Sequence, residues 1–221
     1  MTVHELVASL PAPSELRARC RALALLDSIV SAPFAPSHTF VNDWRPGVEL
    51  AFMENGSGDQ YAVVFDPAGV FLYGFDHESD ATPWREEDRA HWPGLLDGLP
   101  ASLAHYAQVP EFQFLDFFDA TVCAWYETGS TSWQCGPVEF ADGETDGADW
   151  LFELLTEADG ARAFAGFAED DHQRSVDGEA VAAVLKGAPL DRRTVAALSA
   201  TANFDTVATQ ARVLGYQVQS S

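Results

Sequence analysis

The fold is decided by residues 48–75, which read VELAFMENGSGDQYAVVFDPAGVFLYGF. Three runs in this segment, 48–54, 61–65 and 70–75, are rich in the β-branched and aromatic residues that favour strands. The runs are separated by NGSG and DPAG, two turn sequences in which glycine and proline supply the backbone angles that a reversal needs. Short turns join antiparallel neighbours. The segment therefore predicts an antiparallel meander.

Upstream of the meander, residues 38–44 have strand composition and predict one more strand. Before them, apolar side chains recur at helical spacing from Leu16 to Val30, and Ser14 has the residue type of a helix N-cap. We predict a helix over residues 14–31, which ends at the prolines that follow.

Downstream of the meander, a proline-rich segment predicts short helices at residues 94–98 and 101–108, followed by strands at 121–127, 132–135 and 138–140. Apolar spacing then predicts helices over residues 150–155, 160–172, 178–186, 191–199 and 204–214.

These elements predict an α+β protein with an N-terminal helix, a mostly antiparallel β-sheet and a helical C-terminal part packed on it. We predict a single domain over residues 1–221. The alternative is a boundary near 143–147, with the helix and sheet in residues 1–145 and the helical part in 146–221.

The chain carries 34 acidic against 12 basic residues, a net charge of −22. This charge opposes contact with nucleic acid or an anionic membrane, because both are polyanions, and it permits binding to a basic protein. No apolar run approaches the ~20 residues of a membrane span, and the first residues lack a signal-peptide pattern. The three cysteines have no metal or disulfide spacing. We therefore expect a cytoplasmic protein.

Asp76, His77 and Glu78 follow the last strand of the meander and are candidate catalytic residues. Strand ends commonly position functional side chains, and carboxylates beside an imidazole suit acid–base catalysis or metal ligation. Adjacent side chains on an extended chain point to opposite faces, so the three converge only if the backbone turns. The alternative is a polar strand end with local hydrogen bonds.

Residues 142–153 nearly match a twelve-residue calcium loop. Asp142, Glu144 and Asp146 take its first, third and fifth positions, a glycine takes the sixth, and Glu153 takes the twelfth. The eighth position is acidic instead of apolar, and the preceding segment cannot be a helix. We predict a loop for calcium or another divalent cation, entered from a strand. The alternative is a set of acids at a surface turn and a helix N-terminus.

Aromatic residues supply the third candidate site. Trp84, Arg85 and Trp92 lie in the proline-rich segment, and exposed tryptophan near arginine is typical of protein interfaces. The phenylalanine-rich run 112–118 predicts core packing instead. No nucleophile elbow, phosphate-binding loop or dinucleotide fingerprint is present in the sequence, which favours a non-enzymatic role.

Three segments, YGFDHES at 73–79, HWPGLLD at 91–97 and SWQCG at 132–136, resemble a family of uncharacterised bacterial proteins of similar length. The resemblance extends from about Tyr61 to the C-terminus. It implies a single-domain, cytoplasmic bacterial protein and supplies no mechanism. It draws attention to the 76–78 segment, which lies in the most recognisable of the three.

The favoured hypothesis is an acidic protein that binds a basic partner protein, in the manner of an immunity or inhibitor protein, because complementary charge speeds association. One alternative is a metal-dependent hydrolase that uses Asp76, His77 and Glu78. The other is a calcium-binding module built on residues 142–153.

Overall fold

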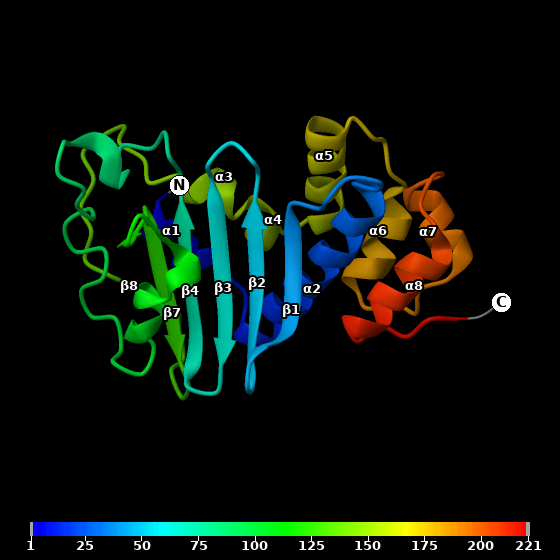
Figure 1. Cartoon of the computed structure of the whole chain (residues 1–221), viewed down its shortest axis with the longest axis horizontal. Helices are drawn as coiled ribbons and strands as arrows, with labels where there is room; N and C mark the ends of the chain where they lie inside the picture. Colours follow the sequence, from blue (N-terminus) through cyan, green and yellow to red (C-terminus); the bar gives the residue numbers. More distant parts are fainter. Residues whose placement is uncertain (1, 220–221) are drawn as a thin grey trace.

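The structure is a computed structural model and describes residues 2–219. Within them, six strands form one antiparallel sheet in the order β1-β2-β3-β4-β7-β8, and β5 and β6 form a separate hairpin (Figure 1). The strands are β1 (His38–Arg45), β2 (Val48–Glu54), β3 (Gln60–Asp66), β4 (Gly69–Phe75), β5 (Gln113–Phe114), β6 (Phe117–Phe118), β7 (Val122–Glu127) and β8 (Gln134–Cys135). The predicted meander is therefore confirmed.

Helices flank the sheet in sequence, and the predicted α+β class is confirmed. The α-helices are α1 (Val3–Ser9), α2 (Pro13–Val30), α3 (Ala148–Leu151), α4 (Glu153–Thr156), α5 (Gly160–His172), α6 (Gly178–Leu185), α7 (Arg192–Leu198) and α8 (Phe204–Val213), and the 3₁₀ helices are η1 (Pro83–Arg85), η2 (Ala104–Gln108) and η3 (Pro110–Phe112). Four of the predicted C-terminal helices correspond to α5–α8 within about a residue at each end. The helix expected at 150–155 is divided into α3 and α4.

Both faces of the central strand β4 are covered, and all seven of its residues are buried. On one face, the ring of Tyr73 lies 5.1 Å from that of Phe112 and 4.8 Å from that of Phe118. On the other face, a Cβ at Gly74 would approach the ring of Phe152 to 2.8 Å. Glycine at this position lets α3 and α4 pack directly against the sheet.

The C-terminal helices pack mainly on α2, which also contacts β1. Figure 1 shows α5 to α8 gathered beyond the β1 edge of the sheet. One cluster of buried apolar residues contains side chains from before and after residues 143–147, for example Leu23 and Val181. The single domain stays a prediction, with the boundary near 143–147 as its alternative.

Of the two short helices predicted between β4 and α3, the one at residues 94–98 is wrong, and the one at residues 101–108 is confirmed only in part. Residues 94–98 form turns, because Gly94 and Gly98 have φ of +85° and +84°, values that an α-helix does not contain. Residues 101–108 hold only the short η2.

The strand expected at residues 138–140 is also wrong. This segment is irregular, and the carbonyl of Glu139 accepts a hydrogen bond from the indole of Trp92 at 2.9 Å instead of pairing with a strand. Helix α1 was missed, although Glu5 accepts a hydrogen bond from the backbone N–H of Thr2, as in a capping box.

A fully buried carboxylate joins three elements beside the β1 edge. Asp27 of α2 is 0% exposed. Its Oδ2 accepts from the backbone N–H of His38 at 2.8 Å and from His38 Nδ1 at 2.9 Å, and its Oδ1 accepts from His172 Nε2 at 2.9 Å. Three donors thus compensate for the lost hydration of a buried acid, and they fix α2, β1 and α5 together.

We predict that Asp27→Asn lowers the free energy of unfolding by about 2–3 kcal/mol, because the amide has one acceptor atom where the carboxylate has two, and it lacks the charge that strengthens the bonds from His38 and His172. His172 can pair with the new N–H₂ only by changing its tautomer. Urea unfolding measures the loss. Ser28→Ala is the control, since Ser28 Oγ bonds only the carbonyl of Leu25, and it should cost less than about 1 kcal/mol. Equal stability of Asp27→Asn and the wild type would contradict the clamp.

Candidate functional site

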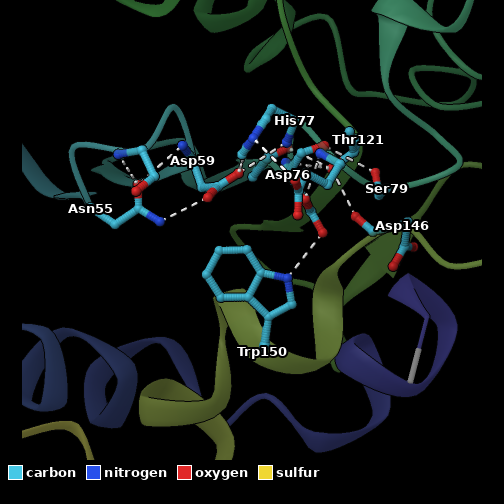
Figure 2. Close-up of polar contacts among 11 residues, drawn as sticks. Asn55, Asp59, Asp76, His77, Ser79, Thr121, Asp146 and Trp150 are labelled. Carbon is cyan, nitrogen blue, oxygen red and sulfur yellow. Dashed lines mark hydrogen bonds and ion pairs between the residues drawn. The ribbon is translucent and has the colours of Figure 1, made fainter. Parts of the chain in front are cut away.

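Two loops that are distant in sequence meet at one end of the sheet. In the β3–β4 pairing, Gln60 lies opposite Phe75. The residue before β3 therefore lies beside the residues after β4. Asp59, Asp76 and His77 offer ligand atoms that all lie within 4.8 Å of one another (Figure 2). This is the one such three-residue group of His, Cys, Asp or Glu within residues 2–219.

Asp59 and His77 form an ion pair when the imidazole is protonated. Asp59 Oδ1 accepts from His77 Nδ1 at 2.6 Å and from its backbone N–H at 3.0 Å, and Oδ2 accepts from Asn55 at 2.7 Å. Burial would raise the pKa of Asp59, but the hydrogen bonds from His77 and Asn55 outweigh it and lower that pKa below its usual value. The bond to Asp59 raises the pKa of His77.

Asp76 is buried and organises the turn after β4. Its Oδ1 accepts from the backbone N–H of Glu78 at 2.9 Å, and its Oδ2 accepts from the indole of Trp150 at 2.9 Å. A Cβ at Gly147 would lie 2.4 Å from Asp76, so only glycine fits where α3 begins. Thr121 accepts from the backbone N–H of Asp76 at 3.2 Å. Asp76 therefore fixes α3 against the sheet as well as lying beside His77.

The structure brings two of the three predicted residues together. Asp76 and His77 share the cluster because the backbone turns at residues 76–79, as convergence requires. Glu78 is directed outward, with a side chain 83% exposed and Oε1 3.8 Å from His77 Nε2. The sequence analysis missed Asp59. The feature that could have indicated Asp59 as a site residue is its position directly after the NGSG turn and before a predicted strand.

Within residues 2–219, no three acids of the predicted calcium loop have ligand atoms that lie within 4.8 Å of one another. Asp146 is buried and accepts from the backbone N–H of Val3 at 2.8 Å and of Ala148 at 3.0 Å. Burial raises the pKa of Asp146 despite these bonds. Glu144 accepts from a nearby backbone N–H, while Asp142 and Glu153 are exposed. Glu144 and Asp146 thus accept from local backbone, and Asp146 also anchors α1, while calcium binding by the loop stays a prediction.

Of the predicted partner-binding residues, Trp84 is exposed, at 47%. Arg85 is half-buried, and its guanidinium donates to the carbonyls of Thr82, Ala90 and His91. Trp92 stacks on Phe140 with ring centroids 5.2 Å apart. Arg85 and Trp92 therefore hold the surrounding loops in place.

The hairpin β5–β6 presents an exposed apolar tip that the sequence analysis missed. Phe112 and Phe118 are buried as predicted, but Phe114 is 59% exposed and Leu115 is 74% exposed. The ring of Phe114 lies 6.1 Å from that of Trp84. We call Trp84, Phe114 and Leu115 the apolar tip.

The tip is held by an arginine and an unusual turn. Arg89 donates to Asp119 and to the carbonyl of Phe114, both at 2.8 Å, and its guanidinium lies 4.3 Å from the ring of Trp84. Leu115 and Asp116 have φ of +49° and +58°, the left-handed values that a tight hairpin turn requires and that glycine or asparagine usually supplies. The exposed side chain of Leu115 thus sits on a strained backbone.

Comparisons with known proteins add no identity. A scan against protein-family models, a search of curated proteins and a search of solved structures each found no match to this chain. The resemblance to a bacterial family therefore stays a prediction. Within residues 2–219, no helix has both the length and the apolar character needed to cross a membrane.

The raised pKa of His77 predicts a pH dependence of stability. A group that binds its proton more tightly in the folded state stabilises the fold below its unfolded pKa, about 6.5, and loses this contribution as pH rises through the raised folded pKa. Asp59, with a lowered pKa, keeps its contribution until the pH falls below its usual range. The ion pair therefore stabilises the fold between these limits.

We expect the wild type to lose more stability than His77→Asn when the pH rises from 6 to 9, because asparagine keeps a donor near the position of Nδ1 but does not titrate. Chemical unfolding at both pH values measures the difference. Glu179→Gln, which removes an exposed acid of α6, is the control and should behave like the wild type. Identical pH profiles for His77→Asn and the wild type would contradict the pairing.

Proposed function

We propose that the chain acts by binding a partner protein through the apolar tip. One observation carries the proposal: Trp84, Phe114 and Leu115 are large, exposed and gathered at a single hairpin. Aromatic side chains at protein interfaces supply most of the binding free energy where water is excluded around them. Burial of three such side chains is worth about 1.5–3 kcal/mol each by area.

Exposed acidic residues next to the apolar tip indicate the kind of partner that would bind it. Glu86, Glu87 and Asp88 follow η1, Asp116 lies in the hairpin turn, and all four are exposed. None of them forms an ion pair within residues 2–219. Unpaired acids around an apolar centre complement a partner that carries lysine or arginine around an apolar hollow, and such complementarity raises the association rate.

The form we favour is an immunity-type or inhibitor-type protein that covers a basic functional surface of its target. The net charge of −22 supports this form, because it attracts a basic protein over long range and repels nucleic acid. The strained turn at Leu115 supports it too, since outliers of this kind concentrate at binding sites.

The test is a pull-down from a lysate of the source organism with wild type, Leu115→Asp and Val213→Asp. Val213 is a matched control, an apolar residue 66% exposed on α8. We expect one stoichiometric basic partner, held by the wild type and Val213→Asp, weakened by salt, and bound at least about 30-fold more weakly by Leu115→Asp, the effect of losing a hot spot. Equal capture by Leu115→Asp would overturn the proposal.

A second function is favoured by the convergence of Asp59, Asp76 and His77. We propose that these residues bind a divalent transition metal. One imidazole nitrogen and two carboxylates are common zinc ligands, and three protein ligands leave a position for water, as a hydrolase requires. Metal would replace the proton on His77 Nδ1, so affinity should rise with pH.

Titration of the metal-free protein with Zn²⁺ at pH 6 and 8 tests this function by calorimetry and by tryptophan fluorescence, because the indole of Trp150 bonds Asp76. We expect tighter binding at pH 8 and an affinity at least about 10-fold lower in His77→Asn. Glu179→Gln, which removes an exposed acid of α6, is the control, with unchanged affinity. Zn²⁺ binding that His77→Asn leaves intact would show that the metal goes elsewhere.

A further inference from the structure

The molecule also has a cavity, which lies away from the apolar tip. A cavity of about 420 Å³ opens between the start of β1, the end of β2 and helices α3, α4 and α5. Its lining includes His38, Trp150, Glu153, Phe167, Asp170 and Asp171. Its volume falls within the range of small-ligand sites.

His38 is a mostly buried residue of the cavity wall, and one of its ring nitrogens has no partner in the described part of the chain. Its side chain is 7% exposed, so it is more than nine-tenths buried. Its Nδ1 must donate, because the Asp27 carboxylate only accepts. Nε2 has no hydrogen-bond partner within residues 2–219. In the neutral imidazole this nitrogen carries a lone pair, which can accept a hydrogen bond from water or from an N–H or O–H donor of a ligand in the cavity.

The charged groups around the cavity are also mostly acceptors. Glu153, Asp170 and Asp171 are exposed and form no ion pair within residues 2–219. Burial raises the pKa of Asp171; nearby His172 and His38 oppose this, and Asp170 adds to it. Arg162 is the one arginine or lysine of the lining, and its side chain is 77% exposed. It lies 3.8 Å from the carboxylate of Glu157, a residue that does not line the cavity. The cavity therefore favours a cation with several donors.

Aromatic rings complete the wall. Trp150 is 43% exposed, and its indole is fixed by the bond to Asp76, as Figure 2 shows. Phe167 packs edge-on against His38, with ring centroids 5.0 Å apart. An organic cation between such rings gains cation–π attraction in addition to hydrogen bonds.

We propose that this cavity binds a guanidinium or primary ammonium group, with His38 Nε2 and the Asp171 carboxylate as acceptors and Trp150 and Phe167 as walls. The proposal is independent of the apolar tip. It does not require a metal, although Asp76, one of the proposed metal ligands, also holds Trp150 of the cavity wall. The group has two possible sources, a free small amine or a basic side chain of another protein. The shared chemistry is an organic cation with N–H donors.

The test is calorimetric titration of the full chain with agmatine, with the peptide Gly-Arg-Gly and with tetramethylammonium, which is a cation without N–H donors. We expect the guanidinium probes to bind at least about 10-fold more tightly than tetramethylammonium, since two charge-assisted hydrogen bonds exceed 1.4 kcal/mol. Tighter binding of the peptide than of agmatine would assign the cavity to a protein side chain, and the reverse order to a free amine.

Two variants locate the site. His38→Asn keeps a donor toward Asp27 and removes the Nε2 acceptor, and Asp171→Asn removes one exposed charge with little risk to folding. Each should weaken agmatine at least about 10-fold, while Asp205→Asn, an exposed acid on α8, should not. Unchanged agmatine affinity in Asp171→Asn and His38→Asn would overturn the proposal. Equal affinity for tetramethylammonium, or no binding at millimolar probe, would overturn it as well.

Discussion

The buried carboxylate of Asp27 is the constraint on which the arrangement of helices and sheet depends. An ionised acid without water is costly unless donors surround it, and this one is satisfied only when α2, the start of β1 and the end of α5 meet. The same contact orients His38 and places α5 beside the sheet edge, where the cavity forms. A single polar interaction thus fixes both the packing of the C-terminal helices and the geometry of a candidate ligand site.

Other buried acids also accept hydrogen bonds that hold distant segments together. The acidic residues therefore fall into two classes, buried and exposed. Asp59, Asp76, Asp119 and Asp146 are buried, and each accepts from a backbone N–H or a side chain of a distant segment. Their hydrogen bonds hold together segments of the chain that are mostly irregular. Most of the remaining acids are exposed. Some of the remaining acids form ion pairs, as Glu49 does with Arg17 and Arg21, but the 12 basic residues cannot pair with all of the 34 acidic ones. The net charge of −22 is therefore chiefly a property of the surface.

The sheet and the long helices could be predicted because their signals are local. Turn sequences such as NGSG and DPAG set the meander, and apolar spacing set α2 and α5 to α8. The candidate site could be predicted only in part, since Asp76 and His77 follow a strand but Asp59 joins them through strand register. Phe114 and Phe118 have the same residue type and similar neighbours, yet one is exposed and the other buried. Which of them faces the core depends on packing across the sheet, and no pattern within the run records it.

The turn at Leu115 has a backbone conformation that costs stability and that the fold alone does not explain. Within residues 2–219, positive φ is taken by eleven glycines and by three other residues. One of the three, Gln173, ends α5, a usual place for this conformation. The other two, Leu115 and Asp116, are consecutive and exposed, and each costs roughly 1–2 kcal/mol relative to glycine. Leu115 recovers little of this by burial in the chain itself, because its side chain is 74% exposed. Glycine would form the same turn at lower cost, and the choice of leucine at this exposed position is the feature of the turn that favours the proposed docking at the apolar tip.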